Sequence, residues 1–164
     1  MRVYDEEIFK KAGLHRHWVQ ESHSRSEKKD VIRGLHFQLP PFAETKLVRC
    51  VRGAVYDVFV DLRKNSPSFG KWGNVELSEE KHNMVYIPRG FAHGFCTLTT
   101  ESDVVYKVDN AYTPEAECGL LWNDPDLAIA WPVSQPVLSI KDAHNVTLKE
   151  FMRNHKYIDH EDQP

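Results

Sequence analysis

The sequence predicts an all-β protein, a sandwich or barrel of jelly-roll type, with short helices only near its ends. Runs rich in Val, Ile, Tyr and Phe recur through the middle of the chain at intervals of roughly ten residues. Turn residues such as Gly, Asn and Pro separate these runs. Strands arranged in this way bury their apolar faces by folding over one another, which favours two packed sheets.

Only two segments have the apolar spacing of a helix. Residues 5–12 begin at an Asp that can cap a helix, carry apolar residues at helical spacing and are followed by Gly13, which predicts a stop. Residues 147–152 place their apolar side chains on one side in the same way. We expect two short helices, one near each end of the chain.

The β body is predicted to cover about residues 18–132 of a single domain that spans residues 1–164, with a C-terminal segment at 133–164. Residues that favour turns, at 52–53, 65–67 and 88–90, separate the expected strands of this β body. The expected strands are residues 31–38, 47–51, 54–62, 72–77, 84–87, 95–98 and 104–108.

Composition excludes several classes of protein. The net charge of −3 gives no electrostatic reason to expect a nucleic-acid or anionic-membrane partner. No stretch reaches the roughly 18 apolar residues that a membrane span requires. The three cysteines are widely spaced and odd in number, which favours buried thiols in a reducing compartment. We therefore expect a cytoplasmic protein.

Polar residues interrupt the apolar faces of several expected strands. Because side chains alternate along a strand, Asp57 shares a face with Val55 and Phe59. By the same alternation, Lys46 and Tyr106 each lie in line with apolar neighbours. Any one of them is more often a structural residue than a functional one, but together they predict a lined cavity inside the barrel.

Two histidines strengthen this interpretation. His36 lies inside the apolar segment 31–38, and His93 lies where a turn feeds an apolar strand at residues 87–95. Imidazole can take or give a proton near neutral pH without large changes in its pKa. Either histidine alone is more often a hydrogen-bonded structural residue than a catalyst, but two at strand ends suggest one pocket.

Six ordered motifs resemble a known family, the dTDP-4-dehydrorhamnose 3,5-epimerases. The matching segments fall between about residues 18 and 142 and are RGLHFQ (33–38), KLVR (46–49), GAVYDVFVDLR (53–63), SPSFGKW (66–72), IPRGFAHGF (87–95) and DPDLAIAWP (124–132). The resemblance implies the double-stranded β-helix of the cupin fold. It also implies an isomerase that inverts C3, C5 or both in a nucleotide-linked 4-keto-6-deoxy sugar, with no metal or other cofactor.

The resemblance assigns a role in proton transfer to four residues. His36 would be the general base, and Asp142 would orient its imidazole and stabilise the charged form. Tyr106 would deliver a proton from the opposite face, as inversion requires. Lys46 would stabilise the enolate that forms beside the ketone.

The resemblance also assigns five binding residues and a homodimer. Arg33 and Gln20 would contact the diphosphate, His93 and Asp57 would form a second layer of the pocket, and Tyr112 would lie beside the sugar or nucleotide. The ligand would be a nucleotide-diphosphate 4-keto sugar.

Some positions differ from the family pattern and leave the nucleotide open between dTDP, GDP and others. Ser22 stands where the family often has Asn, and Cys118 stands where it often has Arg. An early family strand with an Asp-x-Arg-Gly-x-Phe pattern has no counterpart ahead of the first expected helix. The resemblance leaves open the sugar length and the number of centres inverted.

Two other classes of function are alternatives to this epimerase. A metal-dependent cupin oxygenase would need a His-x-His pair, and His15 and His17 have this spacing, but they fall between the first helix and the first strand, where we expect surface exposure. A non-catalytic nucleotide-sugar-binding cupin would need the pocket but no acid and base.

Overall fold

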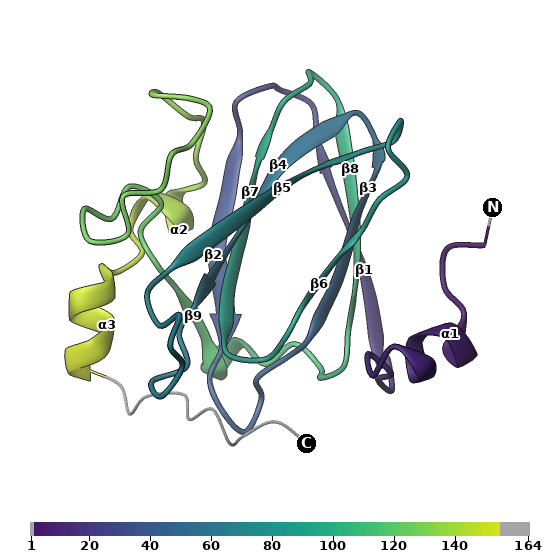
Figure 1. Ribbon diagram of the computed structural model, residues 1–164. Helices are drawn as coiled ribbons and strands as arrows, with labels where there is room; N and C mark the ends of the chain where they lie inside the picture. The colour runs from purple at the N-terminus through teal and green to yellow at the C-terminus, as the bar shows by residue number, and fades with distance from the viewer. Residues whose placement is uncertain (1, 155–164) are drawn as a thin grey trace.

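A computed structural model describes residues 2–154 and has two antiparallel sheets that face each other (Figure 1). One sheet has the order β1 (Gln20–Ser26), β8 (Ser102–Val108), β3 (Lys46–Arg52) and β6 (Val85–Ile87). The other has the order β5 (Trp72–Ser78), β4 (Ala54–Asp61), β7 (Phe91–Thr97), β2 (Ile32–Gln38) and β9 (Glu117–Gly119). The predicted all-β class is confirmed.

Short helices flank the sheets. Helix α1 (Glu6–Lys11) begins after Asp5, whose side chain accepts a hydrogen bond from the backbone N of Ile8 at 3.1 Å. Helices α2 (Ile140–Ala143) and α3 (Leu148–Asn154) lie beside β2 and β9, on the opposite side of the sandwich from α1 (Figure 1). A 3₁₀ turn, η1 (Pro114–Ala116), precedes β9.

The predicted strands are all present, with ends that differ by a few residues. The prediction was wrong in omitting β1, β9 and α2. Strand β1 has the sequence QESHSRS, which contains no apolar residue and therefore gives no alternating pattern. It forms because its backbone pairs with β8 along its whole length, from Gln20 opposite Val108 to Ser26 opposite Ser102.

The first core lies between the two sheets. It is built from buried side chains of both: Val48, Cys50, Val55, Leu77, Ile87, Phe95 and Val104. Asp57 is fully buried on the same side of β4 as Val55, as the alternation predicts. This interior therefore holds a carboxylate beside apolar side chains.

A second core covers the outer face of the five-stranded sheet. The C-terminal segment packs Leu148 and Phe151 onto that face, and the Phe37 and Phe151 rings meet edge to face at 5.1 Å. The sheet contributes Leu35, Phe37, Val58 and Val60, and Leu62 follows β4 directly. Both faces of β4 are thus buried, which explains its nearly continuous apolar sequence. The last part of the predicted C-terminal segment, residues 155–164, lies outside the described range.

Within residues 2–154, no helix has both the length and the apolar character needed to cross a membrane.

Candidate active site

Two cavities adjoin one another between the sheets and share three lining residues. Their volumes are ≈ 280 Å³ and ≈ 250 Å³, and His36, Lys46 and Tyr106 line both. His36 comes from β2 in the five-stranded sheet, whereas Lys46 and Tyr106 come from β3 and β8 in the four-stranded sheet. The imidazole and the phenol therefore reach the shared hollow from opposite walls.

An irregular stretch of β2 sets the position of His36. The register of β2 against β7 shifts between Arg33 and His36, and His36 then pairs directly with His93. Gly34 between them has φ +114°, and a Cβ there would lie 2.6 Å from the Cα of Gly94. Only glycine fits this conformation and this close approach of two strands.

Asp142 orients the His36 ring. The Asp142 Oδ1 lies 2.6 Å from His36 Nε2 and also accepts a hydrogen bond from the backbone N of Gly34 at 3.3 Å. Asp142 Oδ2 accepts from the Ser139 hydroxyl at 2.7 Å. Burial acts to raise the pKa of Asp142, but the hydrogen bonds from His36 and Ser139 outweigh it and hold the pKa below its usual value.

This contact decides which nitrogen of His36 can act as a base. A carboxylate is an acceptor only, so Nε2 carries the proton that Asp142 accepts. The neutral ring then has its lone pair on Nδ1. His36 is partly exposed and lines both cavities.

Lys46 is held by an ion pair inside the cavity. Its Nζ lies 3.1 Å from Oε1 of Glu44 and donates to the backbone carbonyl of His36 at 3.4 Å. Both side chains are nearly buried, with 9% and 11% of their surface exposed. Gln38 donates to the other carboxylate oxygen of Glu44 at 3.1 Å, so the ammonium has a fixed place beside β2.

Asp57 and His93 form a second His–carboxylate pair deeper in the barrel. His93 Nε2 lies 2.8 Å from Asp57 Oδ2. Burial of Asp57 raises its pKa, although His93 and Lys46 act in the opposite direction. His93 lines the ≈ 250 Å³ cavity, whereas Asp57 lies behind it and does not line either cavity.

The predicted binding residues separate into two groups. Gln20 and Tyr112 line the ≈ 280 Å³ cavity, and Gln20 Oε1 accepts from the backbone N of Tyr112 at 3.3 Å. Arg33 instead lines the ≈ 250 Å³ cavity and donates to the Ser26 hydroxyl and the Arg25 carbonyl, each at 3.2 Å. The two expected diphosphate contacts thus lie in different cavities.

Residues that differ from the family pattern fall at different depths. Ser22 lines the ≈ 280 Å³ cavity and accepts from Gln20 Nε2 at 3.2 Å. Cys118 lies in β9, where it packs partly buried against the outer core.

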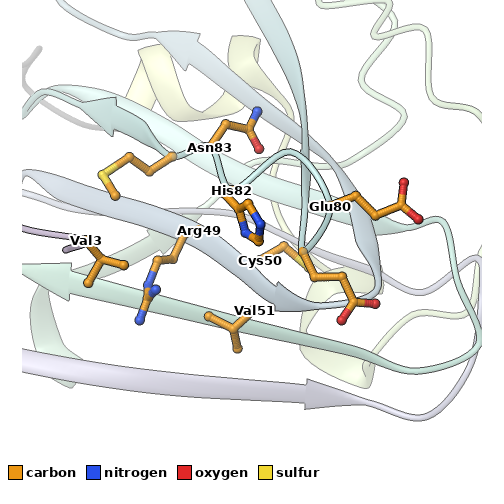
Figure 2. A pocket seen from close by; sticks show the side chains of 9 residues that line it. Val3, Arg49, Cys50, Val51, Glu80, His82 and Asn83 are labelled. Carbon is orange, nitrogen blue, oxygen red and sulfur yellow. The ribbon is translucent and has the colours of Figure 1, made fainter. Parts of the chain in front are cut away.

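A further cavity of ≈ 470 Å³ lies at β3 and the segment before β6. Figure 2 shows the side chains that line it, including Arg49, Cys50, Glu80 and His82. Cys50 donates to the Arg52 carbonyl, and burial raises the pKa of its thiol, which makes a thiolate nucleophile unfavourable. This cavity shares no lining residue with the two that contain His36.

His15 and His17 lie between α1 and β1, and neither lines the cavities that contain His36. Across residues 2–154, no cluster of three or more His, Cys, Asp or Glu side chains is arranged to hold a metal ion.

Comparison with known proteins decides the family. The family model for dTDP-4-dehydrorhamnose 3,5-epimerase matches residues 1–150. The chain belongs to this family. It is similar to the 3,5-epimerase of Shigella flexneri, with 51% identity over 143 residues that cover 87% of this chain and 78% of the relative.

Solved structures of 3,5-epimerases support the same conclusion. One from Bacillus anthracis, with TDP and PPi bound, has a TM-score of 0.89 and 46% identity over 90% of this chain and 84% of its own. One from Legionella pneumophila, in complex with dTDP-4-keto-L-rhamnose, has a TM-score of 0.85 and 42% identity over 89% of this chain and 78% of its own. The chain is therefore an epimerase of nucleotide-linked 4-keto sugars.

Sequence reasoning did not single out three residues in or beside the two joined cavities. Glu44 and Glu117 line the ≈ 280 Å³ cavity, and Ser139 supports Asp142 from the start of α2. Alternation could have found Glu44, which is two residues before Lys46 and therefore on the same face. Glu117 lies in a three-residue strand and Ser139 caps a helix of four residues, and both elements are too short to show a period.

Proposed function

We propose that His36, Asp142, Tyr106 and Lys46 carry out the epimerisation through an enolate. In the first step, Nδ1 of His36 removes the hydrogen next to the ketone of the bound sugar, and the electron pair of that C–H bond moves into the enolate. Asp142 accepts the Nε2–H hydrogen bond throughout and stabilises the imidazolium that forms. The Lys46 ammonium stabilises the enolate oxygen.

In the second step, the Tyr106 hydroxyl delivers a proton to the other face of the same carbon, and the ketone re-forms. A single base that returned its own proton would restore the starting configuration, so inversion requires two groups on opposite sides. The observation that carries this assignment is that His36 and Tyr106 line the same two cavities from opposite sheets.

We propose a dTDP-linked 4-keto-6-deoxy sugar as the ligand. The bound TDP and dTDP-4-keto-L-rhamnose in the two solved relatives support this choice. Gln20, Tyr112 and Arg33, which line the two joined cavities, would hold the nucleotide and diphosphate, with Arg33 suited to a charge-assisted grip on phosphate oxygens. His93 and Asp57 would support the sugar pocket from behind.

We also propose that the enzyme is a cytoplasmic homodimer. Apolar side chains near the four-stranded sheet are exposed: Ile8, Val19 and Val51. A second copy related by two-fold symmetry would cover such residues. Light scattering of the purified chain should give twice the mass of one chain, and a monomer at micromolar concentration would contradict the proposal.

The test of the function uses several nucleotide-linked 4-keto sugars in deuterated water. We expect deuterium to enter C3, C5 or both of the dTDP-linked sugar, and the labelled carbon identifies the centre that is inverted. Exchange only with a GDP-linked sugar would contradict the choice of nucleotide. Binding without any exchange would favour the non-catalytic alternative, and activity lost on chelation and restored by a metal would favour the metal-dependent one.

A further inference from the structure

We propose that Glu117 is a positioning residue that ties the rim of the substrate cavity to the His36–Asp142 pair. Glu117, Tyr112 and Lys141 form a connected set of side chains, here called the rim bridge. The inference rests on the proposed function, because it assigns a task to residues around that same reaction centre.

Three separate elements meet at one oxygen atom in the rim bridge. The Tyr112 hydroxyl, from the segment after β8, donates to Oε2 of Glu117 at 2.6 Å. The Lys141 ammonium, from α2, lies 2.5 Å from the same oxygen. Glu117 itself begins β9. One carboxylate therefore joins the loop that carries Tyr112 to the helix that carries Asp142.

The strand pairing holds Glu117 near the reaction centre. Glu117 pairs with Gln38 in β2, and Gly119, two residues further along β9, pairs with His36. The Glu117 side chain is 16% exposed and lines the ≈ 280 Å³ cavity. Burial acts to raise its pKa, but the contacts with Lys141 and Tyr112 hold the pKa below its usual value, so the group stays charged at neutral pH.

The two ends of the rim bridge act on different parts of the site. Tyr112 is 52% exposed, so little packing fixes its ring, and the hydrogen bond to Glu117 sets its direction at the cavity rim. Lys141 directly precedes Asp142 in a helix of four residues. Its contact with Glu117 links this helix to β9.

These placements predict different kinetic effects for the two contacts. Loss of the Tyr112 contact should weaken substrate binding, because the rim loses a fixed aromatic side chain. Loss of the Lys141 contact should slow the proton transfer, because Asp142 loses support for its position. Loss of Glu117 should do both.

The experiment measures kcat and KM with the proposed dTDP-linked substrate for four variants. We expect Tyr112→Phe to raise KM by about fivefold, as the loss of one hydrogen bond implies, with a smaller change in kcat. Lys141→Met should lower kcat by a similar factor, about fivefold, with a smaller change in KM. Glu117→Ala should show both effects, whereas Glu117→Gln, which keeps an acceptor oxygen, should recover most of the KM.

Glu115→Gln is the matched control, because Glu115 is an exposed carboxylate in η1, two residues away, and does not line the cavity. Its kcat and KM should equal those of the wild type. A merely structural role for Glu117 would lower the melting temperature of Glu117→Ala and Glu117→Gln and leave their kcat and KM unchanged, which would overturn the inference. If the wild type itself neither exchanges nor inverts the substrate, the proposed function fails instead.

Discussion

Replacement of Asp142 by Asn changes the charge beside His36 with little change in shape. Asp142 is 3% exposed, and its Oδ1 accepts from both His36 Nε2 and the Gly34 backbone N. In the variant, the Gly34 N–H requires an acceptor at the Oδ1 position, so the amide oxygen should stay there. The NH₂ group would then face Ser139, whose hydroxyl oxygen can accept.

This network sets the expected size of the effect. The amide oxygen still accepts from Nε2, so the productive tautomer of His36 is kept, and only the charge is lost. A hydrogen bond to a charged group contributes about 1.5–3 kcal/mol, which corresponds to a fall in kcat of roughly 10- to 150-fold. The equivalent change in a Ser-His-Asp triad, where the wrong tautomer forms, costs about 10⁴-fold.

The assay is the initial rate of deuterium uptake into the dTDP-linked 4-keto sugar, followed by proton NMR at saturating substrate. Asp126→Asn serves as the control, since Asp126 is an exposed carboxylate in a surface turn, and its rate should match that of the wild type. A kcat for Asp142→Asn within twofold of the wild type would refute the reasoning. A fall well beyond 150-fold would instead show that the His36 tautomer changes and that the amide oxygen of the Asp142→Asn variant does not stay at the Oδ1 position.

Three further predictions concern Lys46, Gly34 and Asp61. Lys46→Met removes the positive charge beside the proposed enolate and should lower kcat about 10²- to 10³-fold, the loss typical of one electrostatic donor, with a smaller effect on KM. A kcat equal to that of the wild type would contradict the role of Lys46. Gly34→Ala places a Cβ 2.6 Å from Gly94 Cα at φ +114°, so urea unfolding should show a loss of at least about 1–3 kcal/mol, and unchanged stability would contradict the close approach. Asp61→Asn breaks a buried pair with Arg63 at 2.8 Å, which should cost about 3–5 kcal/mol at neutral pH. Burial acts to raise the pKa of Asp61, but Arg63 and nearby hydroxyls outweigh it and lower the pKa well below its usual range. The stabilising effect of the ionised Asp61 is therefore complete above about pH 4 and is lost as the pH falls. The free energy of unfolding of Asp61→Asn should depend less on pH in that range, and an equal dependence would count against the ion pair.

The period of a β-strand explains why much of the cavity could be predicted. Side chains two residues apart share a face, so the pattern predicts Asp57 on the same face as Val55 and Phe59, inside the barrel. The structure buries its carboxylate there. The same rule brought Lys46 and Tyr106 to the interior. Local pattern was sufficient because each strand is regular over several residues.

Periodicity could not place residues that long-range pairing brings to the site. Asp142 follows Gly34 by 108 positions and reaches it through a helix of only four residues, so its place was implied by the family resemblance alone. Strand β1 has no apolar residue and is stabilised by pairing with β8. Glu117 lies in a three-residue strand, which is too short to show a period.

The division of labour between His36 and Tyr106 is tested most directly by His36→Asn and Tyr106→Phe in deuterated water. His36→Asn should bind the dTDP-linked 4-keto sugar but incorporate no deuterium, whereas Tyr106→Phe should still exchange the hydrogen next to the ketone and fail to invert the centre. Deuterium uptake by His36→Asn at the rate of the wild type, or normal inversion by Tyr106→Phe, would contradict the account.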